Sequence, residues 1–186
     1  MKLKYKNIFS IPVLLGIVTV ICIISFYGNK CMKKAYAENF EKEYEFVGEE
    51  GYGELQQTED GLYNYRVNKA DDTAILICYN GAMVDQKREV IVPEKLDGHL
   101  LTVVDELAFS WNEYIEKLVL PDSIVEFRRG LTSNCPNMKS IECSGNIDKV
   151  DEYALVDFRG TVYTNENSVL WKYAKAQGIT VEKLEN

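Results

Sequence analysis

The fold is decided by residues 101–163, which read LTVVDELAFSWNEYIEKLVLPDSIVEFRRGLTSNCPNMKSIECSGNIDKVDEYALVDFRGTVY. Apolar residues recur in this stretch with a 23-residue period. The recurring sets are Leu101/Ile124/Ile147, Val104/Phe127/Val150, Ala108/Leu131/Ala154, Ile115/Met138 and Leu118/Ile141. A period of about 20 to 50 residues is typical of a solenoid, in which each turn buries its apolar face against its neighbours. The period therefore predicts a stack of turns.

Two segments of the stretch share a strand pattern. Residues 115–120 and 138–143 both fit L-x-x-L-x-L, the strand segment of a leucine-rich repeat. The flanking residues resemble the bacterial surface repeats of the BspA or treponemal type, whose pattern contains the motifs IP, AF and CxxL. The matching positions are Val92-Pro93 and Leu120-Pro121, then Ala108-Phe109, then Cys135 to Met138. The resemblance covers about residues 61–186.

The chain departs from that family pattern at a few positions. Asp105, Arg128 and Asp151 stand where the family usually has glycine, and Leu131-Thr132 stands where it has AF. The apolar positions are kept. Period and resemblance together predict an α/β fold: a short, right-handed leucine-rich-repeat solenoid with a 23-residue period, an N-terminal β-hairpin cap and a C-terminal helical cap.

Both ends of the repeat carry patterns that are typical of caps. Two strand-like runs, 62–67 and 73–79, are separated by turn-forming residues and predict a hairpin over one end. At the other end, Ser168 is a suitable N-cap for a helix over 169–177, and Gly178 suits the position after it. The leucine-rich-repeat domain is therefore expected over residues 61–186.

The N-terminal stretch has the composition of a targeting segment. Residues 1–37 contain six lysines and no acidic residue, and residues 11–27 are almost wholly apolar. This pattern is typical of a signal peptide or of an N-terminal membrane anchor. Ala35 and Ala37 favour cleavage after Ala37, whereas the lysine-containing gap after Tyr27 favours a retained anchor. Both alternatives predict an extracytoplasmic protein, either membrane-anchored at the cell surface or secreted.

The rest of the chain is strongly acidic. Residues 38–186 hold 15 basic and 29 acidic residues, a net charge of −14. This charge argues against nucleic acid or an anionic membrane surface as the partner. Residues 38–60 contain nine acidic residues, one lysine and three glycines, which predicts an acidic flexible linker.

The residue inventory argues against catalysis. His99 is the single histidine, so a catalytic triad and a multi-histidine metal site are excluded. The five cysteines form no CxxC pair, and Cys78, Cys135 and Cys143 are expected to be buried thiols. No glycine pattern that could cradle a phosphate is present, and no pair of acidic residues is singled out by spacing. We therefore expect no enzyme activity, no cofactor and no metal site.

The expected function, which follows from the resemblance, is extracytoplasmic protein binding in adhesion or recognition. The partner would be an envelope or host-surface protein, and the N-terminal segment would contact the membrane if it is uncleaved. Since side chains alternate along a strand, the neighbours of the inward L-x-L residues face outward. The candidate partner-binding residues are Ile91, Trp111, Tyr114, Lys117, Val119, Ser140 and Glu142. Two alternatives stay open: a structural envelope or stalk protein without a specific ligand, and a carbohydrate-binding accessory protein.

Overall fold

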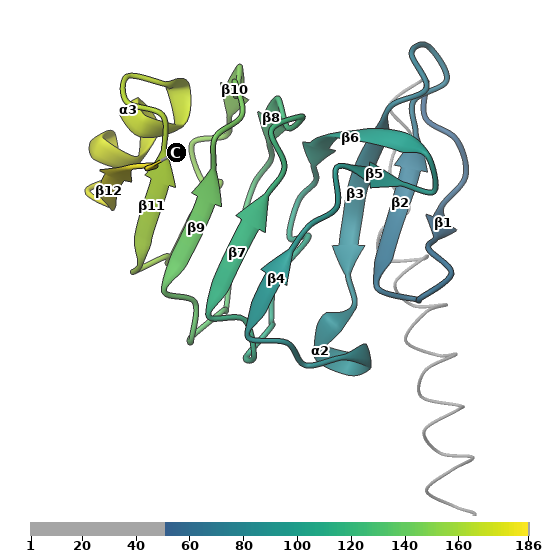
Figure 1. The fold of residues 1–186 in the computed structure, drawn as a ribbon, viewed down its shortest axis with the longest axis horizontal. Helices are drawn as coiled ribbons and strands as arrows, with labels where there is room; N and C mark the ends of the chain where they lie inside the picture. Colours follow the sequence, from purple (N-terminus) through teal and green to yellow (C-terminus); the bar gives the residue numbers. More distant parts are fainter. Residues whose placement is uncertain (1–50, 186) are drawn as a thin grey trace, which may run out of the picture. The chain divides into compact units, whose positions relative to one another are not determined.

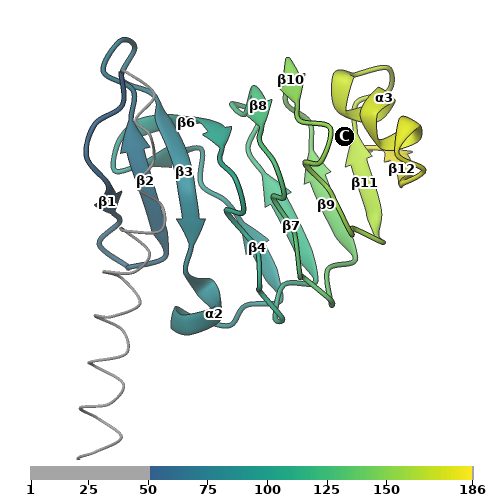
Figure 2. The same ribbon diagram turned by 180° about the vertical axis from the view of Figure 1, so that it is seen from behind.

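The computed structural model describes residues 51–185, drawn as a ribbon in Figure 1 and from behind in Figure 2. The predicted leader over residues 1–37 and residues 38–50 of the predicted linker lie outside the described residues. Within residues 51–185, neither helix is long and apolar enough to cross a membrane.

The described chain forms two β-sheets and two short helices. The first sheet consists of β1 (Gln56–Gln57), β2 (Tyr63–Val67), β3 (Ala74–Tyr79), β5 (Lys95–Leu96), β6 (His99–Val104), β8 (Glu126–Phe127) and β10 (Lys149–Val150). The second consists of β4 (Glu89–Ile91), β7 (Lys117–Leu120), β9 (Ser140–Cys143), β11 (Thr161–Thr164) and β12 (Thr180–Lys183). The helices are α2 (Gly81–Val84) and α3 (Val169–Ala176). From β6 to β11 the chain passes alternately between the two sheets, as Figure 1 shows.

The second sheet is parallel throughout, in the order β12-β11-β9-β7-β4. Its register places Val90, Leu118, Ile141 and Val162 side by side in one row. These four side chains are at most 2% exposed, so the row forms the inner surface of the sheet. Branched and long aliphatic residues suit such a row because they pack closely on a pleated surface.

The first sheet is mixed. β1, β2 and β3 pair antiparallel, β3, β6, β8 and β10 pair parallel, and β5 forms an antiparallel pair with β6. Buried residues of this sheet, such as Leu101 and Phe127, belong to the same apolar core as Leu118 and Ile141 of the second sheet. The two sheets therefore share one core.

The expected fold class is wrong. The structure is a mixed α/β fold of two sheets, and the sheet topology is not that of a leucine-rich-repeat solenoid. A leucine-rich repeat places a helix or a 3₁₀ turn after each strand. Here no helix separates β4, β7, β9 and β11, and the only helices within residues 51–185 lie before β4 and after β11.

The spacing of the strands explains why the 23-residue period was misleading. Leu118 pairs with Ile141 at this offset, and the steps from β6 to β8 and from β8 to β10 have the same offset. By contrast, the step from Glu89 to its partner Lys117 is longer than the period. The step from Ser140 to its partner Thr161 is shorter than the period. The period therefore describes three strand pairings and not the whole architecture.

The predicted caps form, but one of them is part of a sheet. The N-terminal hairpin is present as β2 and β3, and β3 also pairs with β6, so the hairpin belongs to the first sheet. The C-terminal helix is present as α3, with the Ser168 hydroxyl accepting a hydrogen bond from the Trp171 amide at 3.0 Å. Gly178 follows the helix with a φ of 71°, a conformation that favours glycine.

The predicted boundary at residue 61 lies inside the fold. Tyr52 forms a β-bridge with Asn68, and the two residues of β1 pair with β2. Part of the segment predicted as a linker therefore pairs with β2 and with the residue that follows it. Sequence composition could not show this, because the pairing partners come from β2 and the turn after it.

Three turns outside the strands stack on one another through backbone hydrogen bonds. The Phe109 amide donates to the Leu131 carbonyl at 3.1 Å, and the Leu131 amide donates to the Ala154 carbonyl at 2.9 Å. Phe109, Thr132 and Leu155 occupy equivalent positions in these turns and are at most 3% exposed. The Thr132 hydroxyl, however, is buried without a hydrogen-bond partner. An unsatisfied buried hydroxyl costs about 1–3 kcal/mol, so this position is a local defect in the core.

Replacing this hydroxyl by a methyl group should stabilise the fold. We expect Thr132→Val to raise the free energy of unfolding by about 1 kcal/mol, measured by urea denaturation, because the substitution keeps the shape and removes the unpaired polar atom. Thr164→Val is the matched control. Thr164 is also buried, but its hydroxyl lies 3.4 Å from the Ser168 hydroxyl, so the control should lose stability. Equal losses in both variants would contradict this account.

Candidate functional site

The outward side of the second sheet carries the candidate site, which we call the outer face. The parallel register forms it from two rows, one running Ile91, Val119, Glu142, Tyr163 and the other Glu89, Lys117, Ser140, Thr161. In Figure 1 no described helix or strand lies in front of β4, β7 and β9. The outer face is thus open to a partner across these three strands.

Burial alternates along each strand of this sheet. Leu118 and Leu120 are buried in β7, and Ile141 and Cys143 are buried in β9, whereas the intervening residues are partly exposed. The structure therefore places five of the predicted binding residues on the outer face: Ile91, Lys117, Val119, Ser140 and Glu142. Ile91 is the most exposed large apolar side chain of the described part, at 68%.

Lys117 forms the centre of an ion-pair group on the outer face. Its ammonium nitrogen lies 2.8 Å from a Glu142 carboxylate oxygen and 3.3 Å from a Glu89 carboxylate oxygen. The hydrogen bond with Glu142 is the main cause that raises the pKa of Lys117, and Glu89 adds to it. These contacts join β4, β7 and β9 and hold the lysine side chain in one place. Surface ion pairs add little stability, so their main effect here is to order the side chains of the face.

A second ion-pair group lies beside the first, at the start of the strands. Glu116 accepts hydrogen bonds from Arg88 at 3.0 Å and from Lys139, which precede β4 and β9 respectively. The hydrogen bond from Lys139 is the main cause that lowers the pKa of Glu116. The charges along this side of the sheet are therefore paired across neighbouring strands.

Trp111 stands out in the turn between β6 and β7. Its side chain is 63% exposed, and its φ of 55° lies in the left-handed region. Asn134 and Asp157, at the equivalent positions of the next two turns, have φ values of 57° and 64°. Asparagine and aspartate tolerate this conformation, whereas a bulky side chain is an outlier there. Trp111 therefore carries a large apolar group at a position where folding favours a small polar one.

Tyr114 follows Trp111 in the same turn and is half-buried. The turn is held by Asn112, whose side-chain oxygen accepts hydrogen bonds from the Tyr114 amide at 2.9 Å and the Ile115 amide at 3.2 Å. Within residues 51–185, no side-chain hydrogen bond or ring contact joins Trp111 or Tyr114 to the outer face. The two aromatic residues lie in the turn that leads into β7.

Three residues of the outer face were not among the predicted binding residues: Glu89, Thr161 and Tyr163. The aromatic one, Tyr163, adds most to the surface. Tyr163 pairs with Glu142 and continues the row of Ile91 and Val119. It was missed because the step from β9 to β11 is shorter than the 23-residue period. The alternation in Thr161-Val-Tyr-Thr164, with Val162 fully buried, is the signal that could have identified it.

His99 and the cysteines were the residues considered for chemistry. The Nδ1 atom of His99 lies 3.1 Å from an Asp72 carboxylate oxygen. Burial raises the pKa of the Cys78 and Cys143 thiols to about 11, so both are protonated near neutral pH. Among residues 51–185, no group of three or more histidine, cysteine or acidic side chains could hold a metal ion.

The buried ion pair of Asp105 and Arg128 has a structural explanation. Their side chains lie 3.1 Å apart and are only 6% and 15% exposed. Burial raises the pKa of Asp105, while the Glu106 amide and the Arg128 guanidinium oppose that rise. Neither residue lines the pocket beside Pro93 or the pocket beside Tyr173. The pair joins β8 to the end of β6, and Arg128 also approaches Glu126 at 3.4 Å.

Comparison with known proteins gives no relative from which function could be transferred. No protein-family model, no curated protein and no solved structure matches the chain. Any function of the outer face must therefore be inferred from the geometry and chemistry of the residues that form it.

The left-handed backbone conformation of Trp111 predicts an effect on the stability of the fold. We expect Trp111→Asn to raise the free energy of unfolding by about 1 kcal/mol, measured by urea denaturation, because asparagine relieves the left-handed strain. Tyr153→Asn is the matched control, since Tyr153 is 47% exposed and is not among the positive-φ residues. It also loses the Arg129 contact with its ring and should be slightly destabilised. A loss of stability in the Trp111 variant would show that the indole supports the fold.

Proposed function

We propose that the chain is an extracytoplasmic protein-binding module without catalysis, and that it binds its partner through the outer face and Trp111. The basic, apolar N-terminal stretch supports a place outside the cytoplasm. The motifs shared with bacterial surface repeats of the BspA type support recognition or adhesion as the role. A partner on the cell envelope or on a host surface fits both.

The exposed indole of Trp111 is the observation that carries the proposal. Its left-handed conformation costs stability, and because its side chain is 63% exposed, burial returns little stability in exchange. Tryptophan is among the residues most enriched at binding hot spots. Trp171 provides a contrast, because its ring is covered by the Lys175 ammonium at 4.8 Å.

The chemistry of the outer face suits a protein partner. Ile91 and Val119 form an apolar pair on adjacent strands, and Tyr163 adds an aromatic group in the same row. Lys117 is already held by Glu89 and Glu142, so little side-chain entropy is lost when a partner binds around it. The charged residues that the strands of this sheet place on the outer face are Glu89, Lys117, Glu142 and Glu182. Because three are glutamates and one is a lysine, these four side chains carry a net negative charge. A partner surface with basic residues would complement it.

The two alternative functions predict different outcomes. A structural envelope or stalk protein would have no saturable partner at the outer face. A carbohydrate-binding accessory protein would bind purified glycans, with Trp111 stacking on a sugar ring. Capture of a partner protein through the outer face is expected for the proposed function and for neither of these two alternatives.

Site-specific photo-cross-linking in intact cells tests the proposal. Benzoylphenylalanine introduced at Ser140 should give a discrete cross-linked product with a second protein, because Ser140 lies in the middle of the outer face. The same group at Lys172, which is exposed on α3, is the control and should not give that product. Identical products at both positions, or none at Ser140, would remove the support for a binding face.

The purified partner then allows the binding energy to be assigned. Val119→Glu and Trp111→Asn should each weaken binding by roughly tenfold or more, measured by calorimetry, since both remove apolar contact area from the interface. Lys172→Glu should bind as the unmodified protein does. The Trp111 variant is the more informative of the two. If its affinity falls while its free energy of unfolding does not, the loss of binding is not caused by a loss of folded protein. Unchanged affinity in both variants would place the site elsewhere.

The location outside the cytoplasm can be tested independently of any partner. Protease added to intact cells from which the wall has been removed should digest residues 38–186 while a cytoplasmic marker survives. The expected reason is that either a signal peptide or an N-in anchor exports the chain. Equal protection of the protein and the marker would contradict this location. Mass spectrometry of the mature N-terminus distinguishes the alternatives, since a first residue of Glu38 means cleavage.

A further inference from the structure

β4 is an edge strand whose outer side is unpaired. It pairs with β7 and is the last strand of the second sheet. The Arg88 carbonyl accepts hydrogen bonds from β7, and the Val92 amide donates to the Val119 carbonyl at 2.9 Å. In a parallel ladder, alternate residues of a strand bond to the same neighbour. Residues 88, 90 and 92 therefore face β7, and the amide and carbonyl groups of Glu89 and Ile91 point away from it.

Three other sheet edges of the described chain, at β10, β1 and β12, are less suited to pairing. β10 is contacted by α3, and β1 is only two residues long. β12 presents Glu182 and Lys183, and such charged residues discourage a further strand. β4 also carries one charged edge residue, Glu89, but its other edge residue, Ile91, is 68% exposed and uncharged. Of these four edges, the β4 edge is the one at which an additional strand could gain apolar contact.

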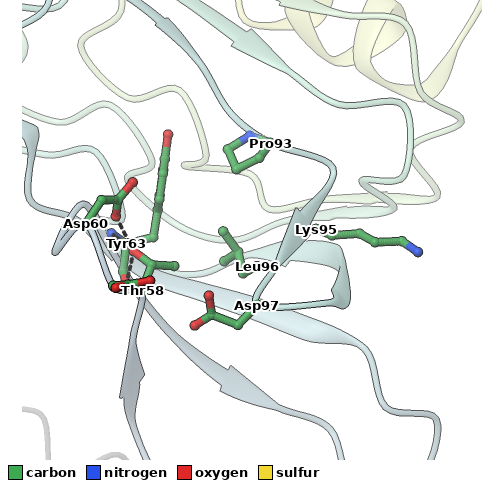
Figure 3. A pocket seen from close by; sticks show the side chains of 8 residues that line it. Thr58, Asp60, Tyr63, Pro93, Lys95, Leu96 and Asp97 are labelled. Atoms are coloured by element: carbon green, nitrogen blue, oxygen red, sulfur yellow. Dashed lines mark hydrogen bonds between the residues drawn. The ribbon is translucent and has the colours of Figure 1, made fainter.

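An acidic pocket lies next to the end of β4. Its volume is about 450 Å³, and it is formed between the turn after β1 and the residues that follow β4. Its lining residues are Thr58, Glu59, Asp60, Tyr63, Pro93, Lys95, Leu96 and Asp97. Figure 3 shows the Asp60 and Asp97 carboxylates on the pocket, while the Lys95 side chain extends away from both.

The carboxylates of this pocket are held in place. Asp60 accepts hydrogen bonds from the Thr58 hydroxyl at 2.6 Å and from the Leu62 amide at 2.9 Å, which lower its pKa and keep it ionised. Asp97 accepts a hydrogen bond from the Tyr65 hydroxyl at 2.8 Å. With Glu59 they present three acidic groups to one open pocket.

We propose that the open edge of β4 and this pocket together bind an extended peptide segment of a partner protein that carries a lysine or arginine. The segment adds a strand to the second sheet by pairing with the backbone of Glu89 and Ile91. Pro93 has no amide hydrogen and ends the available edge, so the segment leaves the strand there. Its basic side chain then lies in the pocket, where the carboxylates complement its charge. This site uses the backbone of β4 and does not rest on binding at the outer face.

Titration with designed peptides tests this site on the full-length protein, kept in detergent because of its apolar leader. The probes are short, capped peptides of alternating threonine and valine that end in glycine and lysine, with a glutamate-ended version as control. The lysine peptide should shift the amide NMR signals of Glu89 and Ile91 and slow their hydrogen exchange. The glutamate peptide should bind roughly tenfold more weakly or not at all, because like charges would meet in the pocket.

Two changes separate the backbone from the pocket. Methylation of alternate peptide nitrogens removes the hydrogen bonds to β4 without altering the protein, and it should abolish binding of the lysine peptide. The double variant Glu59→Gln, Asp60→Asn keeps hydrogen-bond acceptors in the turn and should remove the preference for lysine over glutamate. Lys172→Glu, which lies on α3 and outside both proposed binding places, should leave peptide binding unchanged within about twofold.

Several results would overturn the proposal. The proposal is wrong if the lysine peptide gives no saturable NMR shifts up to about 1 mM. It is also wrong if the shifts occur at residues other than Glu89 and Ile91, or if the methylated peptide still binds. Equal affinity for the lysine and glutamate peptides would also overturn it, because the pocket would then play no part. Self-association of the protein through β4, seen as a dimer by sedimentation, would identify a second copy as the occupant in place of a partner peptide.

Discussion

The structure depends on the parallel register of β7, β9 and β11. This register aligns Leu118, Ile141 and Val162 in a row that is fully buried against the first sheet. A slip of one residue would bury Lys117 in place of Leu118, and an unpaired buried charge would cost more than the stability of a typical domain can offset. The core therefore permits one register, and that register also determines the two rows of the outer face. The candidate binding surface is thus a direct consequence of how the core is packed.

Local patterns in the sequence were sufficient to predict several elements. The L-x-x-L-x-L segments correspond to β7 and β9, and Ser168 caps α3 as expected. The alternation of apolar and polar residues placed Lys117 and Val119 on the outward side of β7. These predictions succeeded because strand alternation and helix capping depend on neighbouring residues of the chain.

The features that failed depend on residues far apart in the sequence. The fold class was wrong because the 23-residue period applies to three strand pairings, while the β4–β7 offset is longer and the β9–β11 offset is shorter. β8 and β10 contain two residues each, too few to show a periodic pattern. The pairing of β1 with β2 and the open edge of β4 are properties of the sheet topology. The left-handed conformation of Trp111, which Asn134 and Asp157 share, is likewise a property of the folded turns.

The two proposed binding places, the outer face and the β4 edge, would recognise a partner on different physical grounds. The outer face offers side chains that are already ordered by ion pairs around Lys117, so it suits a folded surface. The β4 edge offers backbone hydrogen bonds beside a pocket with acidic groups, so it suits an extended segment. Ile91 belongs to both, since its side chain lies on the outer face and its backbone on the edge. A partner that has a folded surface and a basic tail could therefore contact both places at once.

The most direct test of the account is a methyl cross-saturation experiment on the complex with the captured partner. The protein is deuterated except at isoleucine and valine methyl groups, and the partner is left protonated. Saturation of the partner should reduce the signals of Ile91 and Val119, which lie on the outer face, and leave those of Val90 and Ile141, which face the core. Val84 on α2 and Val169 on α3 are exposed controls away from the face. A loss of signal concentrated at Val84 or Val169 would contradict recognition through the outer face.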